Sequence, residues 1–318
     1  MPDSVMQQES SDGIKLAAPA KVNLGLRIVG CREDGYHLIE SLFAPITLCD
    51  DLSVEYAPAK RTTVELLVEI DPAAPASLAE SVPTGPENLA ARAASSFLEA
   101  TGETAAIRIR LHKRIPAGGG LGGGSSDAAA VLRALAQLRP GRLSPEMLAQ
   151  QAVALGADVP FFLVAQPALV RGIGEKIQPI PGIPTLSLIL GHPGEPLSTP
   201  EVFRAWDALP SALTPSPAGS TMRALLGLLT GASADAAGLA EVLGGLLEND
   251  LEPAAVRLCP PVRRLQEDLS RAGALATGMS GSGATVFGVF ADGSSAAAGL
   301  EQLAPRAREW WHLAQTVA

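Results

Sequence analysis

The sequence contains few of the residues that form disulfide frameworks or zinc sites: three cysteines and four histidines in 318 residues. Cys31, Cys49 and Cys259 lie far apart and are odd in number, which argues against a disulfide framework and for a reducing cytosol. No histidine stands at metal-ligand spacing from a cysteine or from a second histidine, so a zinc site is not expected.

Long apolar segments are also missing. No run approaches the roughly 18–20 residues that cross a bilayer, and the richest stretch, 160–170, is interrupted by Gln166 and Pro167. The first residues, MPDSVMQQESSDG, have neither the basic start and apolar segment of a signal peptide nor the arginines of an organelle transit peptide. We therefore expect a cytoplasmic protein without a membrane partner.

Basic residues are a minority, with 24 lysines and arginines against 33 aspartates and glutamates and a net charge of −9. Proteins that bind nucleic acids carry a basic surface, so a nucleic-acid partner is not expected. A small anionic substrate remains compatible with this charge if basic residues gather locally. Those near the motifs described below are Lys21, Arg27, Arg32, Lys113 and Arg114.

Aromatic residues make up only 4% of the chain and hydrophobic residues 47%, which predicts aliphatic cores. The length suits two domains, and the elements do not follow a regular βαβ series. We expect an α+β protein with one domain at 1–163 and a second at 164–318. Strands are predicted at 14–29, 52–56, 63–70, 107–111, 186–190 and 284–290, and helices at 88–101, 128–138, 145–155, 200–209, 222–229, 239–248 and 262–272.

Glycine is concentrated in one loop, where six of the seven residues 118–124 are glycine. A structural turn needs one or two glycines, whereas a loop whose backbone N–H groups surround a ligand needs many, because no Cβ can intervene. A predicted helix follows, and its unpaired N–H groups and dipole favour phosphate. The sequence therefore predicts a phosphate-binding loop rather than a flexible linker. Its residues are Pro116, Ala117, Gly118, Gly119, Gly120, Leu121, Gly122, Gly123, Gly124, Ser125 and Ser126.

Two well-known phosphate loops fit this segment poorly. A Walker A loop has a lysine before its serine or threonine, but Gly124 stands there. Rossmann spacing is present at Gly118, Gly120 and Gly123, but the acidic residue about 20 positions further on is missing. A nicotinamide-dependent oxidoreductase is therefore disfavoured.

Three motifs together resemble the GHMP kinases, the superfamily of galactokinase, homoserine, mevalonate and phosphomevalonate kinases. The motifs are PAKVNL at 19–24, PAGGGLGGGSSD at 116–127 and GMSGSG at 278–283, in the family's order and across nearly the whole chain. The resemblance implies an ATP-dependent kinase with a ribosomal-protein-S5-like N-terminal domain and a ferredoxin-like C-terminal domain. It also implies an active site in the cleft between them.

Further segments resemble one branch of this superfamily, whose acceptor is a cytidine diphosphate-linked methylerythritol. They are DGYH at 34–37, GADVP at 156–160, HP at 192–193 and STPEVF at 198–203. The resemblance implies phosphorylation of the acceptor's 2-hydroxyl in the non-mevalonate isoprenoid pathway. Another GHMP kinase, of the homoserine or mevalonate type, and a non-catalytic nucleotide-binding module stay open as alternatives.

The resemblance assigns Asp158 as the general base and Lys21 as its cationic partner. An aspartate at an element boundary is otherwise most often a cap or turn residue, and a lysine on a strand is most often solvated. Phosphoryl transfer through a loose transition state needs little early proton removal, so an orienting carboxylate is adequate. Asn23 is expected to support the hydroxyl or the lysine.

For the acceptor, the resemblance places Tyr36 and Phe203 on the two faces of the cytosine and His37 at its edge. Thr199 is expected to cap the helix that carries Phe203, with Pro200 at its start, and to contribute to the substrate site. The chain has few aromatic residues, so the alternative for each of these is that it packs in a hydrophobic core.

For the nucleotide, the resemblance places Asn88 near the adenine, and Lys113 is expected to approach the nucleotide because it precedes the glycine loop. Asn88 alternatively only caps a helix, and Lys113 alternatively only faces solvent. Mg²⁺ is expected to bridge the ATP phosphates, with Ser126 as its best-placed protein ligand. The protein is expected to be a monomer or a homodimer.

Overall fold

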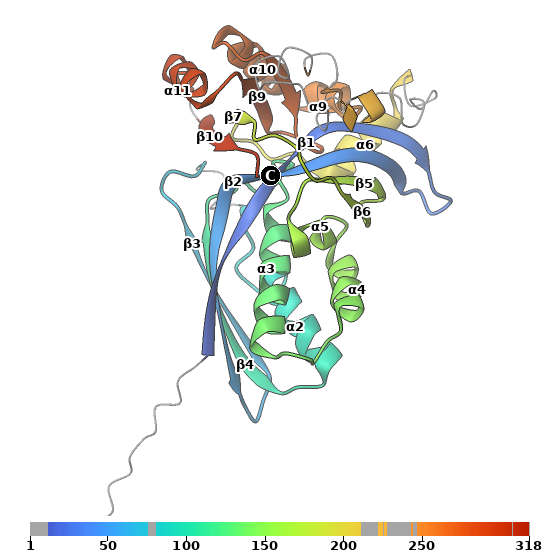
Figure 1. Ribbon diagram of the computed structural model, residues 1–318, viewed down its shortest axis with the longest axis vertical. Coiled ribbons are helices and arrows are strands. Elements are labelled where there is room, and N and C mark those ends of the chain that lie inside the picture. The colour runs from blue at the N-terminus through green and yellow to red at the C-terminus, as the bar shows by residue number, and fades with distance from the viewer. Residues whose placement is uncertain are drawn as a thin grey trace, which may run out of the picture.

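The structure is a computed structural model, and it describes residues 12–75, 81–210, 222–224, 226–227, 243, 247–306 and 308–317. Two long antiparallel strands, β1 (Asp12–Cys31) and β2 (His37–Pro58), run through both parts of the molecule (Figure 1). The predicted strand at 14–29 is confirmed, and the one at 52–56 is the end of β2. A tight turn joins them, in which Gly35 has a positive φ of 86° and donates its N–H to the Arg32 carbonyl.

Six strands form the first sheet. β3 (Thr63–Ile70), β4 (Ala105–Lys113), β5 (Ala168–Gly172) and β6 (Lys176–Pro179) join β2 in the order β3-β4-β2-β5-β6, and β1 pairs with β2. β3 and β4 are parallel, and the other neighbours are antiparallel. β5 and β6 lie after residue 163, the predicted end of the first domain, but they belong to the first sheet. If each sheet defines one domain, the boundary between the domains falls after β6.

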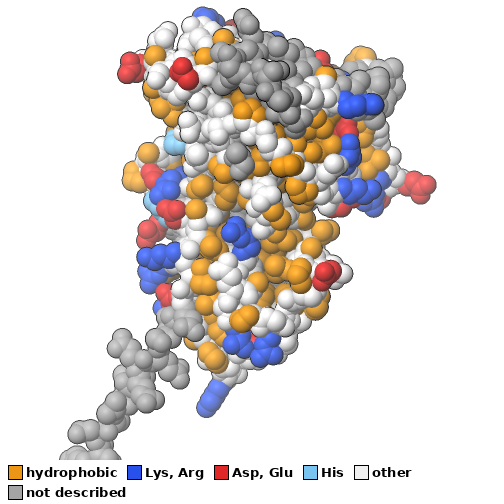
Figure 2. All heavy atoms as spheres, in the orientation of Figure 1, with side chains coloured by type: hydrophobic (Ala, Val, Ile, Leu, Met, Phe, Trp, Pro, Cys, Tyr) orange, Lys and Arg blue, Asp and Glu red, His pale blue; other side chains and the backbone are white. Residues whose placement is uncertain are grey.

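Helices cover one face of this sheet (Figure 1). They are α2 (Leu89–Thr101), α3 (Gly123–Leu138), α4 (Pro145–Leu155) and α5 (Val159–Val164). Charged side chains of both signs lie along the margin of the molecule that β3 occupies (Figure 2). Arg108 on β4 pairs with Glu65 on β3 at 2.9 Å. The sheet therefore buries one face under helices and exposes charged residues at its edge.

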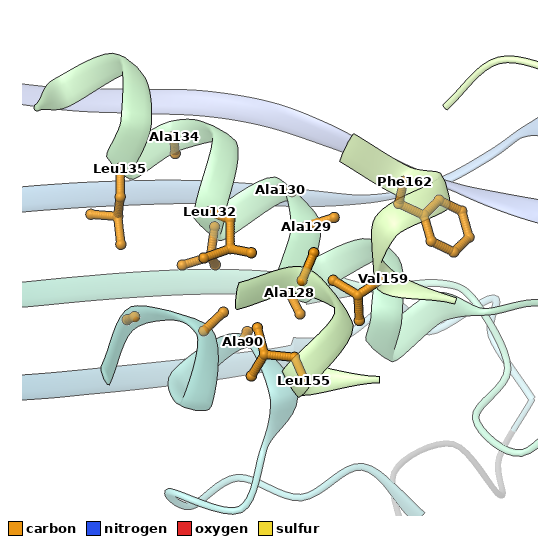
Figure 3. Close-up of a cluster of buried hydrophobic side chains, with 14 of the residues drawn as sticks. Ala90, Ala128, Ala129, Ala130, Leu132, Ala134, Leu135, Leu155, Val159 and Phe162 are labelled. Atoms are coloured by element: carbon orange, nitrogen blue, oxygen red, sulfur yellow. The ribbon is translucent and has the colours of Figure 1, made fainter. Parts of the chain in front are cut away.

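The core of this part is aliphatic, as the composition predicts. α3 lies at its centre and turns alanines and leucines toward α2, α5 and the sheet (Figure 3). Small alanines on α3 and α2 let the helices approach closely. The side chains drawn and labelled there are Ala90, Ala128, Ala129, Ala130, Leu132, Ala134, Leu135, Leu155, Val159 and Phe162.

Two helix boundaries follow directly from local sequence. Asn88 caps α2 by accepting the Ala90 N–H at 2.9 Å, and Gly102 ends the helix in the left-handed conformation. Ser144 caps α4 by accepting the Met147 N–H, and Gly156 ends that helix. These helices are confirmed at the predicted residues.

The second sheet has four strands in the order β10-β7-β9-β8. They are β7 (Ser187–His192), β8 (Ala276–Met279), β9 (Val286–Phe290) and β10 (Trp310–Gln315). Around it lie α6 (Thr199–Asp207), α9 (Glu252–Leu258), α10 (Pro261–Arg271) and α11 (Gly293–Gln302) (Figure 1).

The second part was predicted less completely than the first. β7, β9, α6 and α10 are confirmed, whereas β8, β10 and α9 were not predicted. In the predicted helix at 222–229, the described residues 222–224 and 226–227 are helical, whereas the predicted helix at 239–248 lies mostly outside the described residues. Within the described part of the chain, no helix is long and apolar enough to span a membrane.

Candidate active site

A cleft of about 950 Å³ lies where the phosphate loop, the polar segment of β1 and the start of α6 meet. Residues from both halves of the chain line it, and they include every residue predicted for the site except Ser126. The predicted residues in its wall are Lys21, Asn23, Tyr36, His37, Asn88, Lys113, Pro116, Ala117, Gly118, Gly119, Gly120, Leu121, Gly122, Gly123, Gly124, Ser125, Asp158, Thr199 and Phe203.

The phosphate loop depends on glycine for its conformation. Gly118, Gly120 and Gly122 have positive φ angles of 64°, 74° and 72°, a region that residues with a Cβ rarely adopt. Neighbouring atoms also leave no space for a side chain at one position of the loop. A Cβ at position 120 would lie 2.0 Å from the Ser280 carbonyl oxygen, so no side chain fits there.

The second glycine-rich segment, 278–283, packs against the first. The Ser280 hydroxyl donates to the Gly120 carbonyl at 2.9 Å. Beyond the segment, the Thr285 N–H donates to the Gly119 carbonyl at 3.2 Å. The two glycine-rich segments thus hold each other, although about 160 residues separate Gly120 from Ser280 in the chain.

The loop leads directly into the first turn of α3. Gly122 is the N-cap residue and supplies no capping side chain, and its carbonyl accepts the Ser126 N–H at 2.9 Å. The N–H groups of Gly123, Gly124 and Ser125 precede the first intrahelical hydrogen bond and line the cleft end of the helix dipole. A chain of phosphates fits such a cradle, in which side chains are absent and N–H groups converge.

Lys21 lies at the bottom of the cleft, 2% exposed. Its ammonium donates to the Asn23 side-chain oxygen at 2.5 Å and to the Gly120 carbonyl at 2.8 Å. It also lies 4.7 Å from the centre of the Phe43 ring. Burial lowers the pKa of Lys21, and the negative charge of Asp158 opposes that change. The alternative for this residue, a solvated lysine on a strand face, is therefore excluded.

Asn23 is buried in a hydrogen-bonded network. Its amide donates to the Ser41 hydroxyl at 2.8 Å, and Ser41 donates to the Gly25 carbonyl at 2.6 Å. The Ser280 hydroxyl, which donates to the Gly120 carbonyl, also lies 3.3 Å from the Asn23 side-chain oxygen. Because its amide group is held from both sides, Asn23 fixes the position of the Lys21 ammonium.

Asp158 precedes α5 at the N-cap position but makes no capping hydrogen bond with its side chain. The carboxylate is therefore not used to stabilise the helix, which was the structural alternative for this residue. It lines the cleft and acts electrostatically on Lys21. An acid and a base of opposite charge thus face the same space at the mouth of the phosphate loop.

Aromatic side chains gather at the other end of the cleft. The His37 and Phe203 rings stack with centroids 4.8 Å apart and an angle of 17°, and Trp206 meets the His37 ring edge-on at 5.3 Å. His37 Nε2 is 2.8 Å from the Asp207 carboxylate. Tyr36 is 60% exposed beside this group. Neither His37 nor Tyr36 belongs to a hydrophobic core.

Thr199 does not cap α6. Ser198 occupies the N-cap position, and Thr199 is the first residue of the helix, so the predicted cap is wrong by one residue. The Thr199 hydroxyl instead lies 2.8 Å from that of Ser282. It thereby links α6 to the 278–283 segment across the cleft.

Lys113 is not solvated. It is 3% exposed, and its ammonium pairs with Asp50 and, at 2.8 Å, with Asp127. Burial pulls the pKa of Lys113 down, but Asp127 and Asp50 outweigh it and raise the value. Burial raises the pKa of Asp127 to about 7, against the pull of Lys113. The Lys113 bridge thus joins the end of β4 to the first turns of α3, on either side of the phosphate loop.

Asp50 extends this bridge to the backbone that enters the loop. Its second oxygen accepts the N–H groups of Arg114 at 2.6 Å and Ile115 at 2.9 Å. Asn88 is similarly engaged, since it caps α2 and donates to the Pro83 carbonyl at 2.7 Å. Asn88 nevertheless lines the cleft, so capping does not exclude contact with a nucleotide.

Ser126 lies behind the loop rather than in the wall of the cleft. It is 1% exposed, and its hydroxyl has no hydrogen-bond partner among the described residues. No group of three or more His, Cys, Asp or Glu side chains is placed to hold a metal within the described part of the chain. Its role as a Mg²⁺ ligand stays a prediction.

Several residues of the site were not predicted. Asp50 and Ser41 act through hydrogen bonds formed only in the folded chain, and no local pattern marks them. Ser280 lies within the quoted 278–283 motif but was given no role of its own. Asp207 lies one turn of α6 after Phe203, where a search for carboxylates near the aromatic motif would have found it. Asp127 ends the quoted glycine motif but received no role.

Comparison with known proteins supports the three-motif resemblance. The family model described as "GHMP kinases N terminal domain" matches residues 88–166, and "GHMP kinases C terminal" matches residues 224–307. A 4-diphosphocytidyl-2-C-methyl-D-erythritol kinase from Paramagnetospirillum magneticum is 39% identical over 93% of this chain and 95% of its own length. One from Symbiobacterium thermophilum is 40% identical over 94% and 98%.

The chain belongs to the 4-diphosphocytidyl-2-C-methyl-D-erythritol kinase family. A crystal structure of a 4-(cytidine 5'-diphospho)-2C-methyl-D-erythritol kinase covers 96% of the chain with a TM-score of 0.75 and 36% identity. The predicted two-domain α+β fold of the GHMP kinases is confirmed. Homoserine kinase from Cytophaga hutchinsonii shares the fold of this kinase family, with a TM-score of 0.65 at 19% identity.

Proposed function

We propose that this chain transfers the γ-phosphate of ATP to the 2-hydroxyl of 4-diphosphocytidyl-2-C-methyl-D-erythritol, a step in the non-mevalonate isoprenoid pathway. The observation that carries the proposal is one cleft that joins three features: a glycine cradle, a buried lysine facing a carboxylate, and an aromatic group. Family membership supports the same acceptor.

The glycine cradle binds the phosphates of ATP. The N–H groups at the start of α3 donate to phosphate oxygens, and the left-handed glycines leave room for them. Lys113 and its two carboxylates hold the ends of the loop in place. Asn88, the N-cap of α2, lines the cleft and is the proposed contact to the adenine.

The transferred phosphoryl group needs an oriented hydroxyl more than a strong base. Asp158 accepts the proton of the 2-hydroxyl, and the Lys21 ammonium stabilises the alkoxide character that develops on that oxygen. Asn23 and the Gly120 carbonyl fix the ammonium. Charge stabilisation is strong here because Lys21 is buried.

The acceptor's cytidyl end binds at the aromatic group. Tyr36 and Phe203 supply faces on which a base stacks, a contact worth about 1–3 kcal/mol, and His37 supplies a polar edge. Thr199, whose hydroxyl lies 2.8 Å from that of Ser282, belongs to the wall of the same cleft. In the proposed complex, the acceptor's alcohol therefore extends toward Asp158.

Mg²⁺ supplies charge neutralisation on the ATP phosphates. Ser126 fits the role of a protein ligand in one respect, since its buried hydroxyl has no hydrogen-bond partner among the described residues. Most of the coordination would come from the nucleotide and water, as Mg²⁺ prefers.

The test is turnover with three alcohols under the same conditions: the cytidyl acceptor, homoserine and mevalonate, each with MgATP and with ADP release as the readout. We expect ADP release with the cytidyl acceptor alone, and a new phosphate monoester on its 2-hydroxyl by ³¹P NMR. Turnover of homoserine or mevalonate without turnover of the cytidyl acceptor would contradict the proposal.

A further inference from the structure

One acidic residue of the aromatic group has no part in the mechanism above. Asp207, the last residue of α6, lies 2.8 Å from His37 Nε2 and lines the cleft. It comes from the second half of the chain, 170 residues from His37. A contact between such distant segments at the rim of a substrate cleft calls for an explanation beyond surface charge pairing.

The contact determines which nitrogen of His37 carries hydrogen. An ionised carboxylate only accepts hydrogen bonds, and a neutral imidazole has one donor nitrogen and one acceptor nitrogen. With Nε2 donating to Asp207, the neutral ring therefore presents Nδ1 as an acceptor. Nδ1 has no protein partner among the hydrogen bonds of the described residues.

The ring cannot turn freely to exchange its nitrogens. Phe203 stacks on one face at 4.8 Å and 17°, and Trp206 lies edge-on at 5.3 Å. Trp206 is itself 6% exposed and packs in the core of the second part. The His37 side chain is 11% exposed, against 52% for Asp207. The Phe203 and Trp206 rings hold the plane of the imidazole, and the Asp207 carboxylate determines that Nε2 carries the hydrogen.

We propose that Asp207 is a positioning residue that makes His37 Nδ1 a hydrogen-bond acceptor and so selects an amino-bearing pyrimidine over its keto counterpart. Cytosine has a donor amino group at position 4, where uracil has an acceptor carbonyl. An acceptor on the protein pairs with the first and opposes the second. This inference rests on the proposed function for its substrate, but its structural part is independent of it.

The tautomer can be read directly in the free protein. In ¹⁵N-histidine-labelled protein, the Nδ1 and Nε2 shifts distinguish the two neutral tautomers, and His37→Gln identifies the His37 signals among the four histidines. We expect His37 in the Nε2–H form and an Asp207→Asn protein with mixed forms, because an amide either accepts or donates. An Nδ1–H form in the unmodified protein overturns the proposal.

The consequence for selectivity is measured with the cytidine and uridine forms of the acceptor. We expect kcat/KM to favour the cytidine form about a hundredfold. Asp207→Asn should lower that ratio about tenfold while leaving the KM for ATP unchanged. Asp207→Glu retains a carboxylate and should restore most of the ratio.

The matched control is Glu201→Gln, which removes a charge from the first turn of the same helix without lining the cleft. It should keep the unmodified ratio. A ratio unchanged in Asp207→Asn, or lowered equally in Glu201→Gln, overturns the proposal. A protein with the Nε2–H form that does not phosphorylate the cytidine acceptor refutes the proposed function instead.

Discussion

The two ends of the cleft are built in different ways. At the phosphate end, the ligand-binding groups are backbone N–H groups, and the charged residues Lys21 and Lys113 are 2% and 3% exposed. At the acceptor end, the contacts come from side chains, with Tyr36 60% exposed and the Asp207 side chain 52% exposed. The difference predicts that substitutions at the phosphate end affect stability and catalysis together, whereas those at the acceptor end affect the recognition of one substrate.

The largest effect is expected between the two ends, where Asp158 faces Lys21. Asp158→Asn should lower kcat about a thousandfold, because the amide cannot accept the proton. The side chain makes no capping hydrogen bond, so stability and ATP binding should change little. Measurements of kcat and of ATP affinity by calorimetry check this. Full activity in a variant that binds ATP normally would remove Asp158 as the base.

The second-largest effect is expected at Gly120. It tests whether the phosphate loop tolerates a side chain as an ordinary glycine turn does. Gly120→Ala should lower the free energy of unfolding by roughly 4 kcal/mol and abolish ATP binding, since its Cβ would lie 2.0 Å from the Ser280 oxygen. Thermal or urea unfolding gives the value.

Gly141→Ala is the control for this substitution. Gly141 has nearly the same φ, 76° against 74°, but nothing lies within 4 Å of its Cβ position. It should cost only about 1 kcal/mol and leave ATP binding intact. Equal losses in the two variants would show that backbone conformation, and not the contact between the glycine-rich segments, is what matters.

A third effect concerns a buried histidine behind the loop. Burial lowers the pKa of His192 from 6.5 to about 4, so folding favours the neutral ring. The stabilisation is complete above pH 6.5 and is lost as the pH falls toward 4, a change of roughly 3 kcal/mol. His192→Asn keeps an acceptor for the Gly194 N–H, which His192 Nδ1 accepts at 3.0 Å. Urea unfolding should show a shallower pH dependence in the variant; identical slopes would exclude His192 as the cause.

The smallest effect is expected at the acceptor end. Phe203→Ala should raise the KM for the cytidyl acceptor about tenfold through lost stacking and leave the KM for ATP unchanged. Phe203 is only partly buried, so the free energy of unfolding should change far less than for a core phenylalanine. A matching rise in the KM for ATP would contradict the separation of the two ends.

Most elements of the first part of the fold could be predicted from the sequence, because the residues that mark their ends and faces lie within or beside each element. Asn88, Ser144 and Gly102 mark helix ends by their own chemistry, and the alternation in 63–70 marks β3. The short strands β5, β6 and β8 have five residues or fewer. β5 and β8 are largely buried and β6 is mostly exposed, so none of them shows the alternation that identifies a strand.

The residues of the site show the same difference between local and long-range signals. Residues within motifs, such as Lys21 and Asp158, were found because their motifs are contiguous. Asp50 and Asp207, which orient Lys113 and His37, are 63 and 170 residues from those groups in the chain, so no motif contains both members of either pair. The burial of Lys21 was also hidden, since a lysine on a strand is most often solvated.

A crystal structure of the complex with the cytidyl acceptor and a nonhydrolysable ATP analogue tests the central claim most directly. We predict the triphosphate against the N–H groups of residues 118–125, and the acceptor's 2-hydroxyl within hydrogen-bond distance of Asp158 and Lys21. The cytosine should lie against Phe203 with its amino group toward His37. A triphosphate bound away from the glycine loop, or a 2-hydroxyl directed away from Asp158, would contradict it.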